Sequence, residues 1–508
     1  MPRHRKILDL NDLAVEVGRL KAAGKHVVQC HGVFDLLHVG HIRHFQEARA
    51  FGDVLVVTLT RDEHVNKGPH RPAFPQELRA ESIAALDAVD YVAINRWPDA
   101  VETIRLLKPD FYVKGPDYKD AGADVTGGIA AEADAVASVG GQIRFTDDIT
   151  FSSSSLLNRH MPAFSGEVSE FLTAFRARYQ AGDIRQYIER LRPLRPLVVG
   201  EAIVDEYVYC SAMGKSAKEP ILAMRYERVE RYAGGTLAIA NHLADFCDTV
   251  DLVTYLGCAD AQEEFVRAHL RPNVRPHFIY KSDSPTIVKR RFVESYLLSK
   301  VFEVYEMNDE LLTDAETAAC VAAIGGVLPS ADVVIAADFG HGMLTPPIVE
   351  QLCGQARFLA VNTQTNAANV GFHAISKYPR ADYICMQENE IRLDSRSRKG
   401  DLEPLVIALA KRLSCPTVMV TRGRTGTFFY RDGEGVFECP AFAMSVVDRV
   451  GAGDSVLAVT SLCAAAGVPA DAIGFIANVV GAQAVTILGN SRSIDRIQVL
   501  KSIESLLK

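Results

Sequence analysis

The sequence predicts an α/β protein of two domains, and three observations lead to this prediction. Its 508 residues exceed the size of one ordinary hydrophobic core. Short apolar segments typical of buried strands alternate with segments of helical periodicity along the chain. Two glycine-containing segments that can bind phosphate, residues 31–41 and 451–454, lie far apart in the sequence. We expect a first domain over residues 1–160, a helical linker over 161–195 and a second domain over 196–508.

Composition argues against several classes of protein. The net charge is −8, so phosphate binding is expected at local sites rather than through a global attraction to nucleic acid. Hydrophobic residues make up 48% of the sequence, but no apolar run is long enough to span a bilayer. The ten cysteines are scattered without a Cys-x-x-Cys pair. We therefore expect a cytoplasmic protein without a nucleic-acid or membrane partner.

In the first domain the predicted elements follow one another as βαβ units. Residues 11–25 have the periodicity of an amphipathic helix, and residues 27–30 form a short buried strand. Further helices are expected from His41 onward, at 80–86 and at 100–107, and further strands at 53–59, 91–94 and 111–114. This alternation is typical of a parallel, Rossmann-like sheet covered by helices.

The second domain is predicted to be a separate three-layer α/β sheet. Residues 165–192 show two stretches of helical spacing, interpreted as packing helices, and the proline-containing segment 192–196 precedes a strand at 197–200. Further strands are expected at 333–337, 358–361, 383–385 and 417–420, and a helix at 455–466. No convincing repeat relates the two halves.

The first chemical site is predicted in the loop that follows strand 27–30. In a parallel sheet this loop lies at the carboxyl edge, where open α/β sheets bind their ligands. His38 and His41 are one helical turn apart, and Gly40 between them lets the backbone approach a ligand. Nucleotidyl transfer builds negative charge on the attacking phosphate and the α-phosphate, which imidazole and lysine groups stabilise.

The segments Gly32-Val-Phe-Asp35 and His38-Val-Gly-His41 resemble the signature of the cytidylyltransferase-type nucleotidyltransferases over the first third of the chain. The resemblance implies that His38 and His41 bind the triphosphate and that Lys67 and Arg79 neutralise its charge. It implies a nucleotide site made of Gly32, Phe34, Asp35, Gly40, Lys114, Ser152, Ser153 and Ser154. Asp35 is also a candidate to hold Mg²⁺ or to orient a histidine. The neighbouring histidines 31, 44, 64 and 70 are interpreted as ordinary surface or core residues.

The second chemical site is predicted at Gly451-Ala452-Gly453-Asp454. A glycine-rich turn before an apolar helix presents backbone amides and the positive end of the helix to an anion. A carboxylate in that turn can take a proton from a sugar hydroxyl while the amides stabilise charge on the phosphoryl group. Asp454 is therefore the predicted general base.

Together with this turn, Gly234–Asn241 and Val420–Gly426 resemble segments of the ribokinase-like sugar kinases. The resemblance implies a three-layer α/β/α kinase that uses ATP and Mg²⁺, with a small β lid within 207–231 and 286–304 through which such kinases often pair. A monovalent cation is a further cofactor to consider. The implied sugar site is Asp205, Gly234, Gly235, Asn241 and Lys289; the implied ATP site is Thr421, Gly423, Gly426, Gly451, Ala452 and Gly453; Glu390 is the implied magnesium-organising residue.

Two further segments, Lys218–Pro220 and Thr286–Phe292, are similar to those of heptose-phosphate kinases, which also occur fused to a nucleotidyltransferase. This similarity implies phosphorylation of D-glycero-β-D-manno-heptose 7-phosphate at the anomeric hydroxyl. After a separate phosphatase acts, nucleotidyl transfer would give ADP-heptose and pyrophosphate. The sequence departs from that family in its order of domains and at several positions. Ala360-Val-Asn-Thr-Gln364 stands where the family has an Asp-Pro-Lys segment, Gln387 replaces Asn, Val450 replaces Thr and His341 replaces Lys.

Alternatives to this interpretation remain at the level of sequence. The same two reactions could act on another sugar or polyol phosphate, with CTP as the second nucleotide. A nucleotide or sugar-phosphate sensor with an inactive kinase half, or a kinase with a silent first domain, are further hypotheses. The sequence does not distinguish adenine from cytosine as the transferred base.

Overall fold

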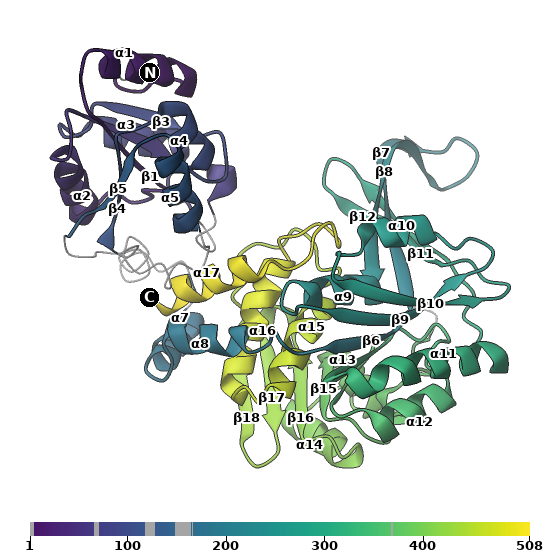
Figure 1. Ribbon diagram of the computed structural model, residues 1–508. Coiled ribbons are helices and arrows are strands. Elements are labelled where there is room, and N and C mark those ends of the chain that lie inside the picture. The colour runs from purple at the N-terminus through teal and green to yellow at the C-terminus, as the bar shows by residue number, and fades with distance from the viewer. Residues whose placement is uncertain (1–4, 66–70, 117–127, 148–163, 165, 367–368) are drawn as a thin grey trace. The chain divides into compact units, whose positions relative to one another are not determined.

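The computed structural model describes residues 5–65, 71–116, 128–147, 164, 166–366 and 369–508. The chain divides into two compact units, one formed by residues 1–165 and 500–508 and the other by residues 166–499. Each unit is built on its own α/β sheet (Figure 1). The prediction of two α/β domains, the first of them Rossmann-like, is confirmed.

The first unit contains a five-stranded parallel sheet in the order β3-β2-β1-β4-β5. Its strands are β1 (Val27–Gly32), β2 (Val54–Leu59), β3 (Tyr91–Ile94), β4 (Phe111–Lys114) and β5 (Gln142–Phe145). The strand order reverses at β1, which pairs with β2 on one side and β4 on the other. The loops after β1 and β4 therefore flank the switch point at which such sheets bind ligands.

Helices cover both faces of this sheet because side chains alternate along each strand. The helices are α1 (Leu10–Ala22), α2 (Val39–Arg49), α3 (Gln76–Ala84), α4 (Val101–Leu107) and α5 (Gly128–Ser138). Val28 and Leu55 pack with Phe45 of α2 and Ile83 of α3 on one face. On the other face, Val27 packs in the core that includes the apolar residues of α1.

Several helix boundaries differ from the predictions, and two of the differences matter for the sites. The helix expected from His41 begins at Val39, because His38 caps its N-terminus. The helix expected at 455–466 spans Ala452–Ala465, so the glycine-rich turn is partly helical. The first helix ends at Ala22 rather than at Lys25, since Gly24 adopts a left-handed conformation.

The second unit is built on a nine-stranded sheet in the order β10-β9-β6-β13-β14-β15-β16-β17-β18. Its strands are β6 (Pro196–Gly200), β9 (Val250–Gly257), β10 (Val274–Lys281), β13 (Val333–Asp338), β14 (Leu359–Thr363), β15 (Tyr383–Gln387), β16 (Thr417–Thr421), β17 (Thr427–Arg431) and β18 (Gly435–Cys439). The pairs from β10 to β16 are parallel, and β17 and β18 are added antiparallel.

Helices accompany this larger sheet along the whole unit. They are α7 (Gly166–Arg176), α8 (Ala181–Glu189), α9 (Thr236–Ala244), α10 (Glu263–His269), α11 (Asp314–Val327), α12 (Pro346–Gln355), α13 (Glu388–Asp394), α14 (Leu402–Arg412), α15 (Ala452–Ala465), α16 (Ala470–Ala484) and α17 (Arg496–Leu507), of which α17 extends into residues of the first unit. Within the described ranges, no helix has the length and apolar character needed to cross a membrane.

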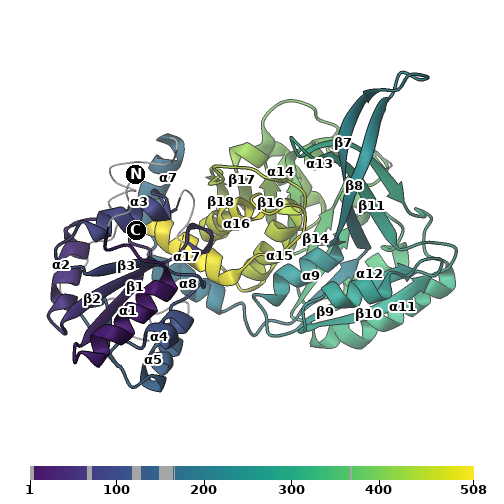
Figure 2. The same ribbon diagram turned by 90° about the horizontal axis from the view of Figure 1, so that it is seen from above.

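A second, four-stranded sheet in this unit forms the predicted lid. Its order is β12-β11-β7-β8, with strands β7 (Ala202–Lys215), β8 (Leu222–Gly235), β11 (Ile287–Glu294) and β12 (Ser299–Glu306). The long hairpin of β7 and β8 projects from the rest of the unit (Figure 2). Because β7 follows β6 after one residue and β8 leads into α9, the base of the lid adjoins the carboxyl edge of the large sheet.

Candidate active sites

The loop after β1 has a constrained backbone that supports the two predicted histidines. Phe34 adopts φ 46°, a left-handed conformation that costs a residue with a side chain about 1 kcal/mol or more. A Cβ at Gly32 would lie 3.1 Å from the Phe34 ring, and that ring meets His41 edge-on at 5.3 Å. Glycine at position 32 therefore leaves room for the ring against which His41 packs.

His38 and His41 lie together at the N-terminus of α2. Their rings stack with centroids 3.9 Å apart, and the Gly40 amide donates to His38 Nδ1 at 3.1 Å. A ring nitrogen that accepts a hydrogen bond carries no proton, so neutral His38 has its proton on Nε2. Burial lowers the pKa of His38, which favours this neutral form. At the positive end of a helix, such an Nε2–H group can donate to a phosphate oxygen.

Asp35 holds the segment that precedes α3. Its carboxylate accepts the amides of Ala73 at 2.6 Å and Phe74 at 3.3 Å, and it pairs with Arg71 at 3.1 Å. The Asp35 and Arg71 side chains are almost completely buried. The observed contacts thus fix the Arg71–Phe74 segment beside the site, rather than orienting a histidine as the sequence suggested.

Arg79 is buried beneath the first site and binds the loops that surround it. Its side chain is 0% exposed and pairs with Asp62 at 2.6 Å. It also donates to three backbone carbonyls, those of Val33 at 2.5 Å, Thr60 at 2.9 Å and Phe74 at 3.0 Å. In this structure Arg79 is a positioning residue, whereas the sequence predicted direct neutralisation of a triphosphate.

We expect Arg79→Met to destabilise the first unit by about 3 kcal/mol, because three buried carbonyls lose their donor. The only tryptophan of the sequence, Trp97, packs against the core of this unit, so urea unfolding followed by tryptophan fluorescence reports on it. The nearby Arg61, whose side chain is 44% exposed, offers a matched control, and Arg61→Met should change stability by less than about 0.5 kcal/mol. Equal stability of the two variants would contradict this role.

Lys114 ends β4 on the other side of the switch point. Its ammonium group pairs with Glu132 of α5 at 2.7 Å, and both side chains are largely buried. Glu132 was not predicted, since an acidic residue on a helix gives no sequence signal of its partner. Lys67, Ser152, Ser153 and Ser154 lie outside the described residues.

The second site lies where α15 begins at the glycine-rich turn. Gly451 adopts φ 79°, and a Cβ there would lie 2.1 Å from Oδ1 of Asn490. Glycine is therefore required both by the backbone conformation and by the close approach of Asn490. Ala452, Gly453 and Asp454 form the first turn of the helix, where amides and the helix dipole favour an anion.

The Asp454 carboxyl group is buried in this first turn. Its Oδ1 accepts a hydrogen bond from Gln364 at 2.6 Å. Burial and the nearby Asp205 raise the pKa of Asp454 to about 7. A carboxylate with such a pKa can accept a proton near neutral pH, as a general base must. In the sequence, Gln364 is visible only as part of a departure from the heptose-kinase pattern. Its contact with Asp454 depends on the fold.

Asp205 on β7 is the centre of a buried polar cluster beside this turn. It pairs with Arg291 of β11 at 2.5 Å and accepts from Asn490 at 3.0 Å. A Cβ at Gly234 would lie 2.1 Å from Asp205 Oδ2, which explains the glycine there. Gly235 has φ 55° and caps α9. Residues 205, 234 and 235, which the sequence predicted together, are thus adjacent. Arg291 and Asn490 belong to the same cluster but were not predicted.

Lys289 lies in the same neighbourhood, whereas Asn241 binds elsewhere. The Lys289 ammonium is 5.3 Å from the centroid of the Tyr305 ring and close enough to Asp205 and Asp454 to interact with their charges. Burial lowers its pKa. The Asn241 side chain donates to the carbonyl of His269 at 2.8 Å and accepts the Arg271 amide at 2.9 Å. These contacts hold the segment after α10.

Glu390 organises backbone beside the predicted nucleotide site. Its two carboxylate oxygens accept the amides of Thr365 at 3.0 Å and Gln387 at 2.8 Å. Gly423 and Gly426 have φ values of 57° and 94° in the turn after β16, which Thr421 ends. A Cβ at Gly426 would lie 2.0 Å from the carbonyl oxygen of Cys439, so this turn requires glycine.

Among the described residues, no group of three His, Cys, Asp or Glu side chains is arranged to hold a metal ion. Mg²⁺ bound with a nucleotide keeps water and phosphate oxygens as most of its ligands. Isolated carboxylates such as Glu390 and Asp454 therefore fit a magnesium–nucleotide complex better than a metal held by the protein alone.

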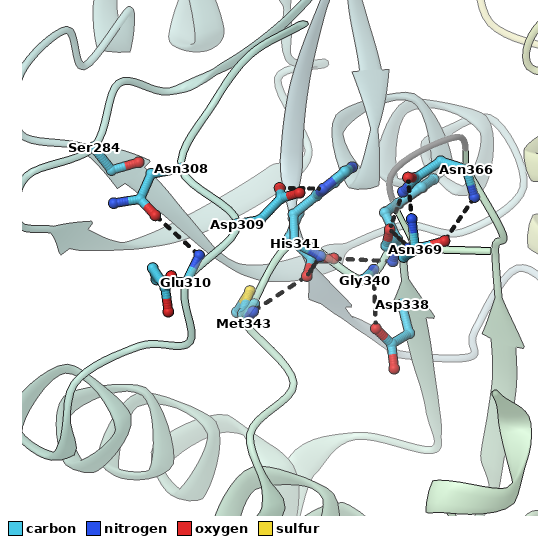
Figure 3. A network of polar contacts seen from close by, with 12 residues as sticks. Ser284, Asn308, Asp309, Glu310, Asp338, Gly340, His341, Met343, Asn366 and Asn369 are labelled. Carbon is cyan, nitrogen blue, oxygen red and sulfur yellow. Dashed lines mark hydrogen bonds and ion pairs between the residues drawn. The ribbon is translucent and has the colours of Figure 1, made fainter. Parts of the chain in front are cut away.

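The loop after β13 is held by the buried carboxylate of Glu201. This group accepts the amides of Phe339 and His341 at 3.1 Å and of Met343 at 3.2 Å. His341 Nδ1 bonds to Asp309 at 3.0 Å, as Figure 3 shows. Burial lowers the pKa of His341 to about 4, so a neutral imidazole stands where the sequence comparison expected a lysine. The positive charge of that lysine is absent from this position.

Comparison with known proteins gives a family match for each of the two domains. Residues 196–496 match the pfkB family carbohydrate kinases, and this match covers more than half of the chain. The chain belongs to the pfkB family of carbohydrate kinases. Residues 30–158 match the cytidylyltransferase-like family, so this pfkB kinase carries a cytidylyltransferase-like domain at its N-terminal side. Both predicted resemblances, and the predicted order of the two domains, are confirmed.

The pfkB kinase is also similar to curated proteins named "Bifunctional protein HldE". It is 45% identical to the one from Geobacter sulfurreducens over 115 residues, which is 22% of this chain and 24% of the relative. It is 39% identical over 168 residues to the one from Geobacter metallireducens, which is 32% of each chain. These matches span only about a quarter to a third of either protein.

Solved structures support the fold of the kinase domain. The tetrameric inhibited form of phosphofructokinase-2 from Escherichia coli matches with a TM-score of 0.50 and 13% identity, covering 62% of this chain and all of that chain. The same enzyme in complex with potassium matches with a TM-score of 0.51 and 14% identity over the same shares. At this identity the likeness concerns the fold alone.

Proposed function

We propose that this bifunctional transferase makes a nucleotide-activated sugar. The kinase domain would phosphorylate a sugar phosphate with ATP, and the cytidylyltransferase-like domain would couple a sugar 1-phosphate to a nucleotide. The observation that carries the proposal is the presence in one chain of two separate anion sites, His38 and His41 at α2 and Asp454 at α15. The two family matches support it.

In the proposed kinase step Asp454 removes the proton of the acceptor hydroxyl. The resulting oxygen bonds to the γ-phosphorus of ATP, the bond to the β-phosphate oxygen breaks, and ADP leaves. The first turn of α15, from Ala452 onward, stabilises the charge on the transferred phosphoryl group. Magnesium bound with ATP would supply charge neutralisation near Glu390.

In the proposed nucleotidyl transfer an oxygen of the sugar 1-phosphate attacks the α-phosphorus of a nucleoside triphosphate, and pyrophosphate leaves. His38 donates from Nε2, and His41 and Lys114 add hydrogen-bonding or positive groups at the same switch point. Lys67, Ser152, Ser153 and Ser154 belong to the proposal through the sequence resemblance alone. No covalent intermediate with the protein is required.

The best candidate acceptor is D-glycero-β-D-manno-heptose 7-phosphate, phosphorylated at the anomeric hydroxyl, and the best candidate product of the second step is ADP-heptose. Support comes from the sequence segments similar to heptose-phosphate kinases and from relatives named as bifunctional HldE proteins. The ten cysteines are free thiols, which is typical of the cytoplasm, where we place both reactions.

One observation favours a second candidate function, in which the kinase domain phosphorylates an acceptor other than heptose 7-phosphate. Segment 360–364, which stands where heptose kinases have Asp-Pro-Lys, contains no lysine, and its Gln364 donates directly to Asp454. Together with neutral His341, this removes two positive charges expected near the kinase site. Another sugar or polyol phosphate, with CTP in the second step, would then be the substrate. A sensor without turnover and a kinase with a silent first domain are the remaining alternatives.

Mass-resolved turnover tests the proposal. The purified protein is incubated with Mg²⁺, with ATP, CTP or GTP, and with a panel of sugar phosphates that includes heptose 7-phosphate and heptose 1-phosphate. A second phosphate on heptose 7-phosphate and ADP-heptose from heptose 1-phosphate would support the heptose assignment. Reaction of other sugars alone would exclude heptose, and nucleotide binding without any turnover would favour the sensor.

The pH dependence of the kinase step should reflect Asp454. Because its raised pKa of about 7 must be exceeded for the base to be ionised, kcat should fall as the pH drops through 7. Gln364→Lys places an ammonium group beside this carboxylate, so the acidic limb should move to lower pH. Gln364→Glu should move it to higher pH. Identical limbs in all three proteins would contradict the assignment.

We also propose that the protein forms a homo-oligomer through the lid. Large apolar side chains are exposed along its strands, among them Met213, Leu222, Tyr226, Phe302 and Val304. Exposed apolar surface of this kind is typical of a protein interface. Light scattering should show an oligomer for the wild-type protein and a smaller species for Leu222→Glu. A monomeric wild-type protein would contradict the proposal.

A further inference from the structure

One buried carboxylate joins the lid to the anion-binding turn. Asp448 lies three residues before Gly451. Its Oδ1 binds Lys300 Nζ at 2.5 Å and accepts the amides of the next two residues at 2.7 and 3.2 Å. Its Oδ2 accepts the Tyr207 hydroxyl at 2.8 Å and the Gly489 amide at 3.0 Å. Five donors from four parts of the chain therefore converge on Asp448.

Two of these donors come from the lid strands on either side of β11. Tyr207 is on β7 and Lys300 is on β12, and these strands flank β11, which carries Lys289 and Arg291. The two amides that follow Asp448 lead directly into Gly451. The position of the lid and the direction of the backbone entering the anion-binding turn are thus fixed by the same group.

A second connection runs through the loop that contains Gly489. Asn490 donates to Asp205 at 3.0 Å, and its Oδ1 lies against Gly451, where a Cβ would be 2.1 Å away. A Cβ at Gly489 would lie 3.1 Å from the Tyr207 ring, so the ring packs closely on this glycine. The proposed sugar site at Asp205 and the anion-binding turn consequently share a loop that Asp448 anchors.

Lys300 contributes the one positive charge among the five donors to Asp448. Burial by itself would raise the pKa of Asp448, but the hydrogen bonds from Lys300 and Tyr207 outweigh it, and the pKa is lowered. A buried carboxylate that loses its cation is left with an uncompensated charge. The lid therefore supplies the cation that pairs with the Asp448 carboxylate and contributes to its lowered pKa.

We propose that Asp448 and Lys300 are positioning residues that make the anion-binding turn competent for phosphoryl transfer only while the lid strands β7 and β12 are docked on it. The lid also carries Lys289 and Arg291 of the proposed sugar site. Sugar binding would then be coupled to the geometry of the amides that hold the transferred phosphoryl group, although neither Asp448 nor Lys300 contacts reacting atoms.

Removal of the Lys300 ammonium tests this proposal in the full-length protein. We expect Lys300→Ala to lower kcat for phosphorylation of heptose 7-phosphate by about 10- to 100-fold, as misplacement of groups around a reaction centre does. KM for ATP should change much less. Ammonium chloride should restore part of the lost kcat, because the small cation can occupy the space of the missing group, whereas tetramethylammonium chloride should not.

Hydrogen exchange gives a readout that needs no substrate. The amides of residues 449–453 should exchange faster in Lys300→Ala than in the wild-type protein, and ammonium should slow them again. Lys215→Ala is the matched control, since this exposed lysine ends β7 in the same lid sheet. It should leave both kcat and amide exchange unchanged.

The outcomes separate this inference from the proposed function on which its kinetic part rests. Wild-type kcat and unchanged exchange in Lys300→Ala would overturn the coupling. A loss of kcat with lower thermal stability and no response to ammonium would assign Lys300 a purely structural role, and would also overturn it. Failure of the wild-type protein to phosphorylate any sugar phosphate would reject the proposed function, while the exchange experiment would still test the coupling.

Discussion

Asp454→Asn is expected to lower the rate of the kinase reaction by about 10²- to 10⁴-fold, the range typical of a lost general base. The substitution keeps the size of the side chain, and an amide oxygen can still accept the hydrogen bond from Gln364. The fold and ATP binding should therefore be retained. Formation of ADP in the presence of the acceptor sugar phosphate measures the effect.

Two controls make this result specific. Asp432→Asn changes an exposed aspartate of the same domain and should leave kinase turnover unchanged. Nucleotidyl transfer to an added sugar 1-phosphate should proceed at the wild-type rate in Asp454→Asn, since the first anion site lies in the other unit. Kinase activity close to the wild-type value would show that another group acts as the base.

His38→Asn is expected to lower nucleotidyl transfer by about 10²- to 10³-fold, the loss typical when one donor to a developing charge is removed. Asparagine is a good N-cap, so α2 should remain capped although the imidazole is lost. The release of pyrophosphate from nucleoside triphosphate and sugar 1-phosphate measures this step. The kinase reaction of the same variant should be unaffected.

A neighbouring histidine provides the matched control for this experiment. His44 lies on the same helix, and its Nδ1 bonds to Thr146 at 3.0 Å. His44→Asn should change the rate of nucleotidyl transfer much less than His38→Asn does. Similar losses in both variants would indicate that the N-terminal half of α2 is merely sensitive to substitution, and would contradict the assigned role of His38.

Local patterns in the sequence were enough to predict the two large sheets and the glycine-rich turn before α15. Strands such as β3 and β4 matched their predicted ranges because short apolar runs have few alternatives inside a parallel sheet. Helix starts were predicted less well. At His38 the deciding feature is a hydrogen bond that the Gly40 amide donates to the imidazole side chain, and apolar periodicity carries no sign of it.

The roles of charged residues depended on contacts between distant segments. Arg79 and Asp35 looked like phosphate or metal ligands in the sequence, but the folded chain uses both to hold loops. Asn241 likewise binds the segment after α10. A charged or polar side chain can bind a phosphate, a metal ion or a backbone group. Only the tertiary structure determines which of these partners is within reach.

The sequence by itself determined the two-domain α/β architecture, the glycine-rich turns and the presence of His38, His41 and Asp454, because these features rest on periodicity and local backbone geometry. The tertiary structure alone decided the raised pKa of Asp454, its contact with Gln364 and the convergence of Tyr207 and Lys300 on Asp448. Burial and electrostatic interactions depend on the distance between groups in space, and Lys300 and Asp448 are 148 residues apart in the chain.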